Sequence, residues 1–412
     1  MTLFSSFKHK KKILIEGHSN IGTGYQMLFK IGESIYSPDY DFHLEGHSEK
    51  FPSEYNDSGD IRFGNISGDV SYPIWVEKIK GTAPNRTAYV WVKILDPLDN
   101  DFYIYCYYGN ANADNVSNGH NVFEFFDDFS TWEGWQQYDK GIVEWTTEQT
   151  YVGTHSLKKY NWGDPSGGYK LIGNTISRGN VVLEVMVFRS ETSSAPANRV
   201  GMEDASFNGY GYFHNTTPQP AQNREEFLAI DIRTSGQPTA VYGPTIGDLL
   251  NQWYLARLIL LPTTVIAEAW DPEYKTQYGS VSTSHSNYQS FDRVAVHGGT
   301  PYYIGLIRIR KYADPEPQIL DVSNESNVFS KLNGIVKGFD NNPITGKTGK
   351  IFILDKDTGH FLATTPINNE GEWYCHHVPV EAGTEVLVVA FLKNDNTEYI
   401  TSAEYKTTEA LS

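Results

Sequence analysis

The stretch YIYCYYGNANADNVSNGHNVFEFFDDFSTWEGW, residues Tyr103–Trp135, decides how the chain is divided. A tyrosine-rich run stops at Gly109 and Asn110, and small polar residues follow as far as Asn121. Aromatic and acidic residues then begin a new run. Because Gly and Asn favour turns over strand interiors, the stretch indicates a joint between two modules rather than an active-site loop. Its aromatic residues are predicted to lie where two cores meet.

Length and composition favour several β-modules. At roughly 100 to 200 residues per domain, 412 residues predict two to four domains. Aromatic residues make up 14% of the chain and Met occurs 4 times, while Val, Ile, Thr and Tyr crowd short alternating runs. Such residues fit a pleated, half-buried surface. The sequence therefore predicts an all-β protein with three β-sandwich modules in series.

The charge argues against some classes of partner. A net charge of −17 does not suit a protein that binds a nucleic-acid backbone, which needs a basic surface. No run approaches the ~18 apolar residues of a membrane span, so membrane insertion is not expected. Cys106 and Cys375 form one bridge at most, and no secretion signal is recognisable at the first residues. Synthesis in a cytoplasm is the expectation.

Residues 1–122 are predicted to form the first sandwich. Four motifs occur in order: Asp60–Phe63 (DIRF), Tyr72–Glu77 (YPIWVE), Val90–Lys93 (VWVK) and Tyr107–Asn110 (YYGN). With these motifs the segment resembles a domain of unknown function (DUF2341) that recurs in bacterial, archaeal and viral surface proteins. The resemblance implies no catalytic residues.

Residues 123–313 are predicted to form a larger sandwich. Alternation along one run places Leu228, Ile230 and Ile232 on one face, and Asp231 and Arg233 on the other. The runs DDF, LEVMVF, WYLARLIL, VIAEAWD and IGLIRIRKY follow one another in this segment. Their order resembles the concanavalin A-like lectin/glucanase (LamG-like) jelly roll.

Residues 314–329 carry prolines and no periodicity, which predicts a linker. Residues 330–412 are predicted to form a small Greek-key sandwich with hairpin turns at 357–359 and 368–371. This segment resembles the carboxypeptidase-regulatory-like, Ig-like module of tailed-phage structural proteins. The resemblance is carried by Gly334 and Val336, Pro343, Ile353–Gly359, Gly371–Tyr374 and Val386–Ala390.

A saccharide-binding face is the first candidate site. Aromatic rings stack on sugar rings, while arginines and carboxylates bond to hydroxyl groups. Alternation in the second module nominates Tyr210, Tyr212, His214, Asp231, Arg233, Arg257, Glu268 and Trp270. The competing interpretation is that these are ordinary core and rim residues of a large sandwich.

Catalysis and metals receive less support. The jelly-roll resemblance implies that a retaining glycanase would carry Glu-x-Asp-x-x-Glu on one strand, with two carboxyl groups ~5 Å apart. Met186 stands two residues after Glu184, where that pattern needs its second acid. The chain is therefore expected not to be an enzyme and to need no cofactor. The jelly-roll resemblance also implies a structural calcium ion held between an early acid and an Asp near the last strand. Asp127 and Asp128 are the candidate early ligands, although Gly305 stands at the late position.

These observations lead to one main hypothesis and two alternatives. The main hypothesis is a non-enzymatic structural or adhesion protein of a tailed virus, associated with its tail or fibre and binding host-surface glycan. It predicts other virion proteins as partners, a homo-oligomer, and a virion that is assembled in the host cytoplasm and is extracellular after release. The first alternative is a secreted or cell-surface carbohydrate-binding protein. The second is a glycanase with a non-standard acid pair.

Overall fold

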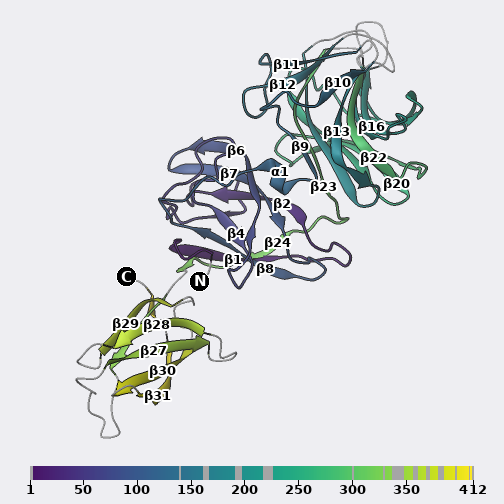
Figure 1. Ribbon diagram of the computed structural model, residues 1–412. Coiled ribbons are helices and arrows are strands. Elements are labelled where there is room, and N and C mark those ends of the chain that lie inside the picture. Colours follow the sequence, from purple (N-terminus) through teal and green to yellow (C-terminus); the bar gives the residue numbers. More distant parts are fainter. Residues whose placement is uncertain are drawn as a thin grey trace.

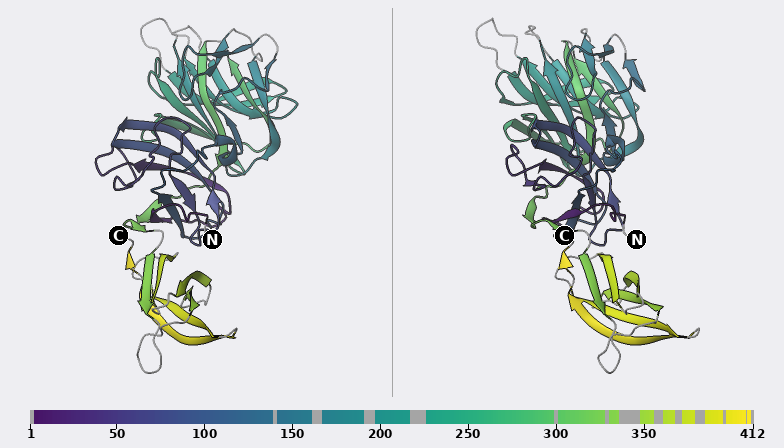
Figure 2. Two further views of the ribbon diagram at one scale, coloured as in Figure 1. Left: turned by 60° about the vertical axis from the view of Figure 1, so that its left-hand side comes forward. Right: turned by 90° about the vertical axis from the view of Figure 1, so that its left-hand side faces the viewer.

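The protein is almost entirely β-structure and is arranged as modules along the chain, which confirms the predicted fold class (Figure 1). The computed structural model describes residues 3–138, 141–160, 167–190, 197–216, 226–298, 301–327, 330–335, 348–355, 361–367, 372–378, 385–394, 397–407 and 409–410. Within these ranges, no helix is both long and apolar enough to cross a membrane. Figure 2 shows the first module between the other two.

The first module packs two sheets face to face. The larger sheet has the order β24 (Ile319–Val322), β1 (His9–Ile15), β8 (Phe102–Tyr108), β4 (Arg62–Gly64) and β5 (Ser71–Tyr72), and β25 (Ser326–Asn327) also pairs with β1. The smaller sheet has the order β3 (Phe42–His43), β2 (Tyr25–Gly32), β7 (Asn85–Ile94) and β6 (Ile74–Thr82).

Strand β7 is buried on both faces. Val90 and Val92 point into the core of the first module, and Trp91 between them points to the second module. Since successive side chains of a strand alternate, a strand buried on both sides becomes continuously apolar. This is why the run YVWV, Tyr89–Val92, carries no charged residue.

Part of the predicted linker is strand. Ile319–Val322 and Ser326–Asn327 form β24 and β25, and both pair antiparallel with β1 at the start of the chain. The segment lacks the periodicity of a half-buried strand because Leu320 and Asp321 are exposed and Ile319 and Val322 are half-buried. Here the backbone pairing with β1 forms strands that the side-chain pattern does not predict.

The second module is a larger two-sheet sandwich. Its seven-stranded sheet has the order β10 (Trp135–Tyr138), β13 (Gly167–Ser177), β22 (Ser290–Gly298), β15 (Ala197–Glu203), β16 (Gly209–Thr216), β17 (Glu226–Thr234) and β18 (Gln237–Thr245). Its eight-stranded sheet has the order β11 (Ile142–Thr146), β12 (Ser156–Tyr160), β23 (Tyr302–Lys311), β14 (Val181–Arg189), β19 (Trp253–Leu260), β20 (Thr264–Trp270) and β21 (Gln277–Ser284), and β9 (Phe125–Asp127) pairs with β23.

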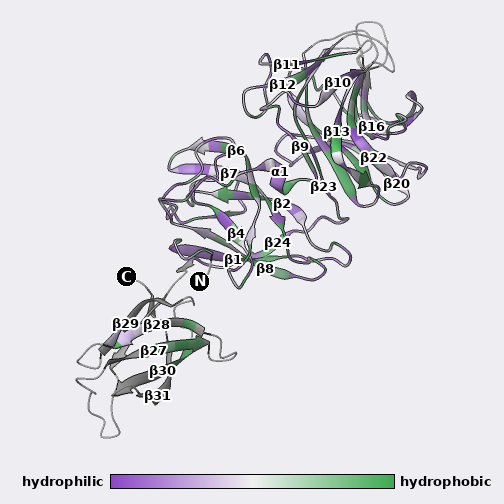
Figure 3. Cartoon of the chain, in the orientation of Figure 1, coloured by the Kyte–Doolittle hydropathy of each residue, from purple (hydrophilic) through white to green (hydrophobic). Residues whose placement is uncertain are grey.

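The inner faces of these sheets form one apolar core, and Figure 3 shows the apolar segments along their strands. Leu228 and Ile230 are fully buried in this core and Ile232 packs against it. Asp231 and Arg233 lie on the opposite face of β17, so the predicted alternation is confirmed.

The third module is described through two small sheets. One contains β29 (Glu372–Val378), β26 (Ser330–Ile335) and β32 (Glu409–Ala410), and the other contains β28 (Phe361–Ile367), β27 (Thr348–Asp355), β30 (Glu385–Asn394) and β31 (Thr397–Thr407). Ile351, Ile353, Val386 and Trp373 are buried. Val336, Pro343 and both predicted turns, at 357–359 and 368–371, lie outside the described residues.

The joint between the first two modules is short and aromatic. The side chain of Asn118 caps the helix α1 (Gly119–Val122) by accepting hydrogen bonds from the backbone of His120 and Asn121. Phe123 and Phe126 follow, and they pack with Trp75 of the first module in a separate apolar cluster. The prediction that these aromatics lie where two cores meet is confirmed.

Candidate functional site: a cleft between two modules

The eight residues proposed as one saccharide-binding face occupy three different places, so the shared face is wrong. Tyr210, Tyr212 and His214 point between the two sheets of the second module. Asp231 and Arg233 lie on the outer face of the seven-stranded sheet. Arg257, Glu268 and Trp270 lie on the outer face of the eight-stranded sheet. Alternation fixes the relative faces within one strand, but not which face is inward or which sheet a strand joins.

The first group belongs to the core. Tyr210 and Tyr212 are 0% and 2% exposed. Arg178 donates a 2.8 Å hydrogen bond to the hydroxyl of Tyr210, and Nδ1 of His214 lies 3.1 Å from the hydroxyl of Tyr254. A ligand cannot stack on these rings without opening the sandwich.

The second group belongs to a charged network on the outer face of the seven-stranded sheet. Arg233 Nε lies 2.9 Å from Asp231 Oδ2 and 3.4 Å from Glu203 Oε1, and Nε2 of His297 lies 2.8 Å from Glu203 Oε1. Strand β16 runs between Glu203 and Arg233 and places Gly209 there. A glycine leaves room for charged side chains on neighbouring strands to meet above it.

This network does not resemble an acid/base pair. Burial raises the pKa of Glu203, but His297 and Arg233 outweigh burial and hold that pKa below its usual value. A glycanase needs one carboxyl group whose pKa is raised so that it can donate a proton. Glu203 therefore fits the role of a structural anion rather than a proton donor.

The third group faces the first module. On the outer face of the eight-stranded sheet, Glu184 of β14 is flanked by Arg257 of β19 and Arg308 of β23, its direct partners in the ladder. All three side chains are buried, with exposures of 2%, 8% and 0%. This outer face is therefore an interface.

Arg308 joins the two modules through two carboxylates. Its Nη1 lies 2.8 Å from Glu77 Oε2 of the first module, and its Nε lies 2.7 Å from Glu184 Oε2 of the second. Trp91 donates a 2.8 Å hydrogen bond to Glu77, and the Arg308 guanidinium lies 4.1 Å from the centre of the Trp91 ring. Burial alone raises the pKa of both carboxyl groups, yet the adjacent arginines hold both pKa values below normal.

A second layer of charge extends this network toward solvent. Arg310 lies 2.8 Å from Glu184 and 2.7 Å from Glu316, which belongs to the segment predicted as a linker. Arg257 lies 3.0 Å from Glu268 and also contacts Glu316. Tyr25 of the first module donates a 3.0 Å hydrogen bond to Glu316. The linker segment thus supplies an anion to the junction.

A cleft of about 530 Å³ opens above this layer. Its walls carry the aromatic side chains of Tyr25, Trp91, Trp270 and Tyr274. Charged side chains of the network form further parts of its lining, which also includes Lys30, Asp41 and Gln318. Its volume falls in the ~300 to 1,000 Å³ range of small-molecule sites, which often lie at domain interfaces. Of the predicted residues, Arg257 and Trp270 line it directly, and Glu268 bonds to both.

The acids proposed for calcium are engaged with protein donors. Oδ2 of Asp127 accepts hydrogen bonds from Trp135 at 2.8 Å and from Lys170 at 2.9 Å. Asp128 accepts a hydrogen bond from the hydroxyl of Tyr55 in the first module. A Ca²⁺ ion needs six to eight oxygen ligands, whereas an ammonium group sits beside Asp127. The arrangement fits a capped and cross-linked joint and does not fit calcium.

Sequence reasoning missed most of the cleft. The family motifs contain Trp91 and Glu77 without predicting a site, and no pattern in the sequence distinguishes Tyr25, Tyr274 and Glu316. The one available signal was a single acid and a single arginine inside otherwise apolar runs, Glu184 and Arg308, because buried charges require partners. The partners come from another module and could not be named in advance.

Comparison with known proteins supports the first resemblance in part. The family model described as a domain of unknown function (DUF2341) matches residues 57–148, which extend past the joint into the second module. An uncharacterized protein of Methanocaldococcus jannaschii is 32% identical over 244 residues, which are 58% of this chain and 22% of that protein. The chain thus matches about a fifth of its archaeal relative's length.

Solved structures similar to this chain include carbohydrate-binding proteins and a glycanase. The carbohydrate binding module CBM66 from Bacillus subtilis has a TM-score of 0.32 at 11% identity, covering 43% of this chain and 96% of that one. The Bacillus licheniformis beta-glucanase has a TM-score of 0.31 at 11% identity, covering 45% and 97%. The VIP36 exoplasmic/lumenal domain, bound to Ca²⁺ and Man3GlcNAc, has a TM-score of 0.35 at 10% identity, covering 46% and 89%. Similarity of this degree says nothing about ligand or chemistry in this chain.

Proposed function

We propose that this chain is a non-catalytic glycan-binding protein and that its ligand lies in the cleft between the first two modules. The observation that carries the proposal is the cleft itself, about 530 Å³ in volume with Trp270, Trp91 and Tyr274 on its walls. Aromatic faces and polar groups on one concave surface suit a sugar, whose rings are apolar on their faces and polar at their edges.

The cleft divides these tasks between its floor and its rim. The arginines and carboxylates beneath it are already paired with one another at 2.7 to 3.3 Å. They hold the walls in place and leave hydroxyl recognition to the rim. Gln318 and Asp41 are exposed and Lys30 is half-buried, and all three line the cleft. A bound sugar is expected to stack on Trp270 and to exchange hydrogen bonds with these rim groups.

A glycan array with the full chain tests the proposal. Trp270→Ala is expected to weaken binding about tenfold or more, because central aromatic residues dominate many binding sites. Gln318→Ala changes an exposed residue of the same cleft and is expected to weaken binding less. The matched control is Tyr242→Ala, which removes a 61% exposed ring from the outer face of the other sheet and should leave binding unchanged.

The outcomes separate the sites. Loss of binding in Tyr242→Ala, with Trp270→Ala unchanged, would place the ligand on the seven-stranded sheet and overturn the cleft. Absence of binding to any glycan by the wild-type chain would reject the proposed function. Tyr212→Ala is a poor probe because Tyr212 belongs to the core.

The virion assignment is a separate proposal. The motif order of the chain is what supports it, together with the resemblance of residues 330–412 to modules of tailed-phage structural proteins. Locating the chain in intact particles by cryo-microscopy tests this placement, its tail or fibre association, the virion partners and the copy number together. The glycan-binding proposal stands or fails independently of that result.

A further inference from the structure

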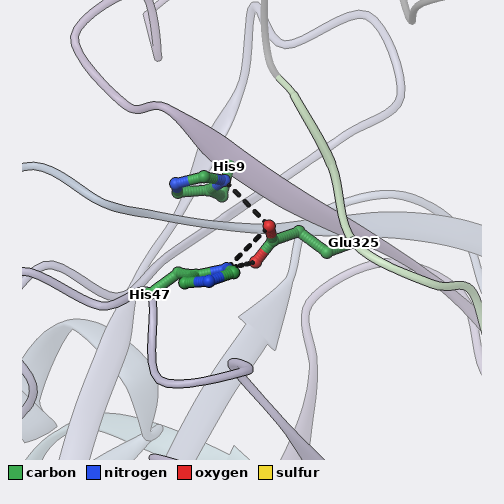
Figure 4. Close-up of side chains that lie close together, drawn as sticks. All are labelled: His9, His47 and Glu325. Carbon is green, nitrogen blue, oxygen red and sulfur yellow. Dashed lines mark hydrogen bonds and ion pairs between the residues drawn. The ribbon is translucent and has the colours of Figure 1, made fainter. Parts of the chain in front are cut away.

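Two histidines and a glutamate converge on one point of the first module, far along the chain from one another (Figure 4). His9 begins β1, His47 lies in the turn after β3, and Glu325 directly precedes β25. Nδ1 of His9 lies 3.0 Å from Glu325 Oε1, and Nδ1 of His47 lies 2.9 Å from the same oxygen. One ligand atom from each residue lies within 4.8 Å of the other two.

We propose that His9, His47 and Glu325 form a binding site for a divalent transition metal ion, with Zn²⁺ the preferred ion. Three protein ligands of the type His₂Glu, with water at a fourth position, are an established zinc arrangement. Tetrahedral bonds of ~2.0 to 2.1 Å place neighbouring ligand atoms about 3.3 Å apart. The two nitrogen-to-oxygen separations, 3.0 and 2.9 Å, need to open by only a few tenths of an ångström, and the ligand atoms of the two histidines lie within 4.8 Å of each other.

The surroundings orient the ligands. The hydroxyl of Tyr108 donates a 2.7 Å hydrogen bond to Oε2 of Glu325. Oε1 faces both imidazoles, and Nδ1 of His47 lies 2.9 Å from each of the two carboxylate oxygens. The His9 ring stacks between Tyr108 and His47, with ring centres 5.6 and 5.2 Å away. Gly109 makes room for this ring, because a Cβ atom there would lie 2.6 Å from His9 Cδ2. Hydrogen bonds to metal ligands from such neighbours raise affinity and fix ligand geometry.

The site is open to solvent and has a structural consequence. The His47 side chain is 53% exposed, so an ion can enter without unfolding the module. Glu325 comes from the segment that leaves the first module, whereas His9 comes from its first strand and His47 from the turn after β3. A bound ion would fasten β25 to β1 at the point where the chain departs toward residues 330–412. We infer that the metal serves as a clamp at this junction.

Metal titration of the full chain, after removal of metal with a chelator, tests the proposal. Calorimetry with Zn²⁺ is expected to give one ion per chain, and Co²⁺ is expected to give the visible absorption of a tetrahedral site. His47→Gln and Glu325→Gln should each weaken Zn²⁺ binding by about 100-fold or more. Zn²⁺ should also raise the melting temperature of the wild-type chain but not that of the variants.

His18→Gln is the matched control, since His18 lies in the same module, 3.6 Å from Glu16, and outside the cluster. With 12 histidines in the chain, adventitious binding would persist in all three variants. Equal affinity in His47→Gln and wild type, or no uptake by the wild-type chain, overturns the proposal. Because the His47 side chain is exposed, His47→Gln should fold normally, and circular dichroism of the variant checks that it does.

Discussion

Each of the two outer faces of the second module carries a buried arginine between two carboxylates. Comparing the two faces shows that the location of the carboxylates determines whether such a network stabilises one module or joins two. On the eight-stranded sheet, Arg308 lies between Glu77 and Glu184 at 2.8 and 2.7 Å. On the seven-stranded sheet, Arg233 lies between Asp231 and Glu203 at 2.9 and 3.4 Å. Both arginines are almost fully buried.

The two devices differ in where their carboxylates come from. Asp231 and Glu203 belong to the same sheet as Arg233, so these ion pairs lie within one module. Glu77 belongs to the first module, so the Arg308 network crosses a boundary. A buried charge that loses its partner is costly. The Arg233 network therefore stabilises a sheet, whereas the Arg308 network couples two modules and holds the walls of the cleft.

The largest expected effect comes from Arg308→Met. The substitution keeps most of the side-chain volume and leaves Glu77 and Glu184 buried with fewer cationic partners, at a cost of about 3 to 5 kcal/mol. We expect the first two modules to unfold in separate transitions, measured by calorimetry and by urea denaturation followed through tryptophan fluorescence.

Arg233→Met is the matched variant, because it removes a similarly buried arginine whose carboxylate partners, Asp231 and Glu203, lie in its own module. It should destabilise the second module without separating it from the first. Identical transition patterns for Arg308→Met and Arg233→Met would show that the crossing network does not couple the modules.

The second largest effect is expected from acidification, which should weaken the network of Arg308 with Glu77 and Glu184 across the two modules. Glu77 and Glu184 have lowered pKa values in the folded chain, so the unfolded chain binds protons first as the pH falls. Their contribution is complete well above the unfolded pKa of about 4.3 and decreases as the pH falls below it. The loss at pH 3 is limited by the unfolded pKa to at most about 2 kcal/mol for each group.

The comparison between variants isolates this effect. Urea midpoints measured from pH 6 to pH 3 should fall more steeply for the wild type than for Glu77→Gln, which has no proton to take up at that position. Parallel pH profiles for the two chains would assign the acid sensitivity to other carboxylates.

Asp231→Asn is expected to have an intermediate effect. The amide keeps the shape of the side chain but removes the anion that faces Arg233, 2.9 Å away, at a cost of about 1 to 3 kcal/mol. The variant also tests for catalysis on this face. We expect no release of reducing ends from polysaccharide by either chain, and release by the wild type that disappears in Asp231→Asn would establish a glycanase.

The sequence predicted the fold better than the site, for a physical reason. Alternation within one strand is local, so the opposite faces of Ile230 and Asp231 could be predicted, and so could the joint at Gly109. Whether a face is covered depends on residues far along the chain. Arg257 looks like a surface residue until Glu316 pairs with it, and Trp270 looks like one until residues of the first module form the cleft with it. Tyr212 looks like a ligand contact until the second sheet covers it.

Glu148→Gln should have the smallest effect on the free energy of unfolding. The variant tests whether the burial of an ion pair, rather than pairing alone, determines its contribution to stability. Glu148 lies 2.7 Å from Lys158 of the same eight-stranded sheet, but its side chain is 53% exposed. Water solvates both charges when the pair is broken, so the unfolding free energy should change by no more than about 0.5 kcal/mol. A loss as large as that of Arg308→Met would mean that any ion pair on this sheet holds it together. The contrast between the two faces would then rest on the number of charges and not on their connection across modules.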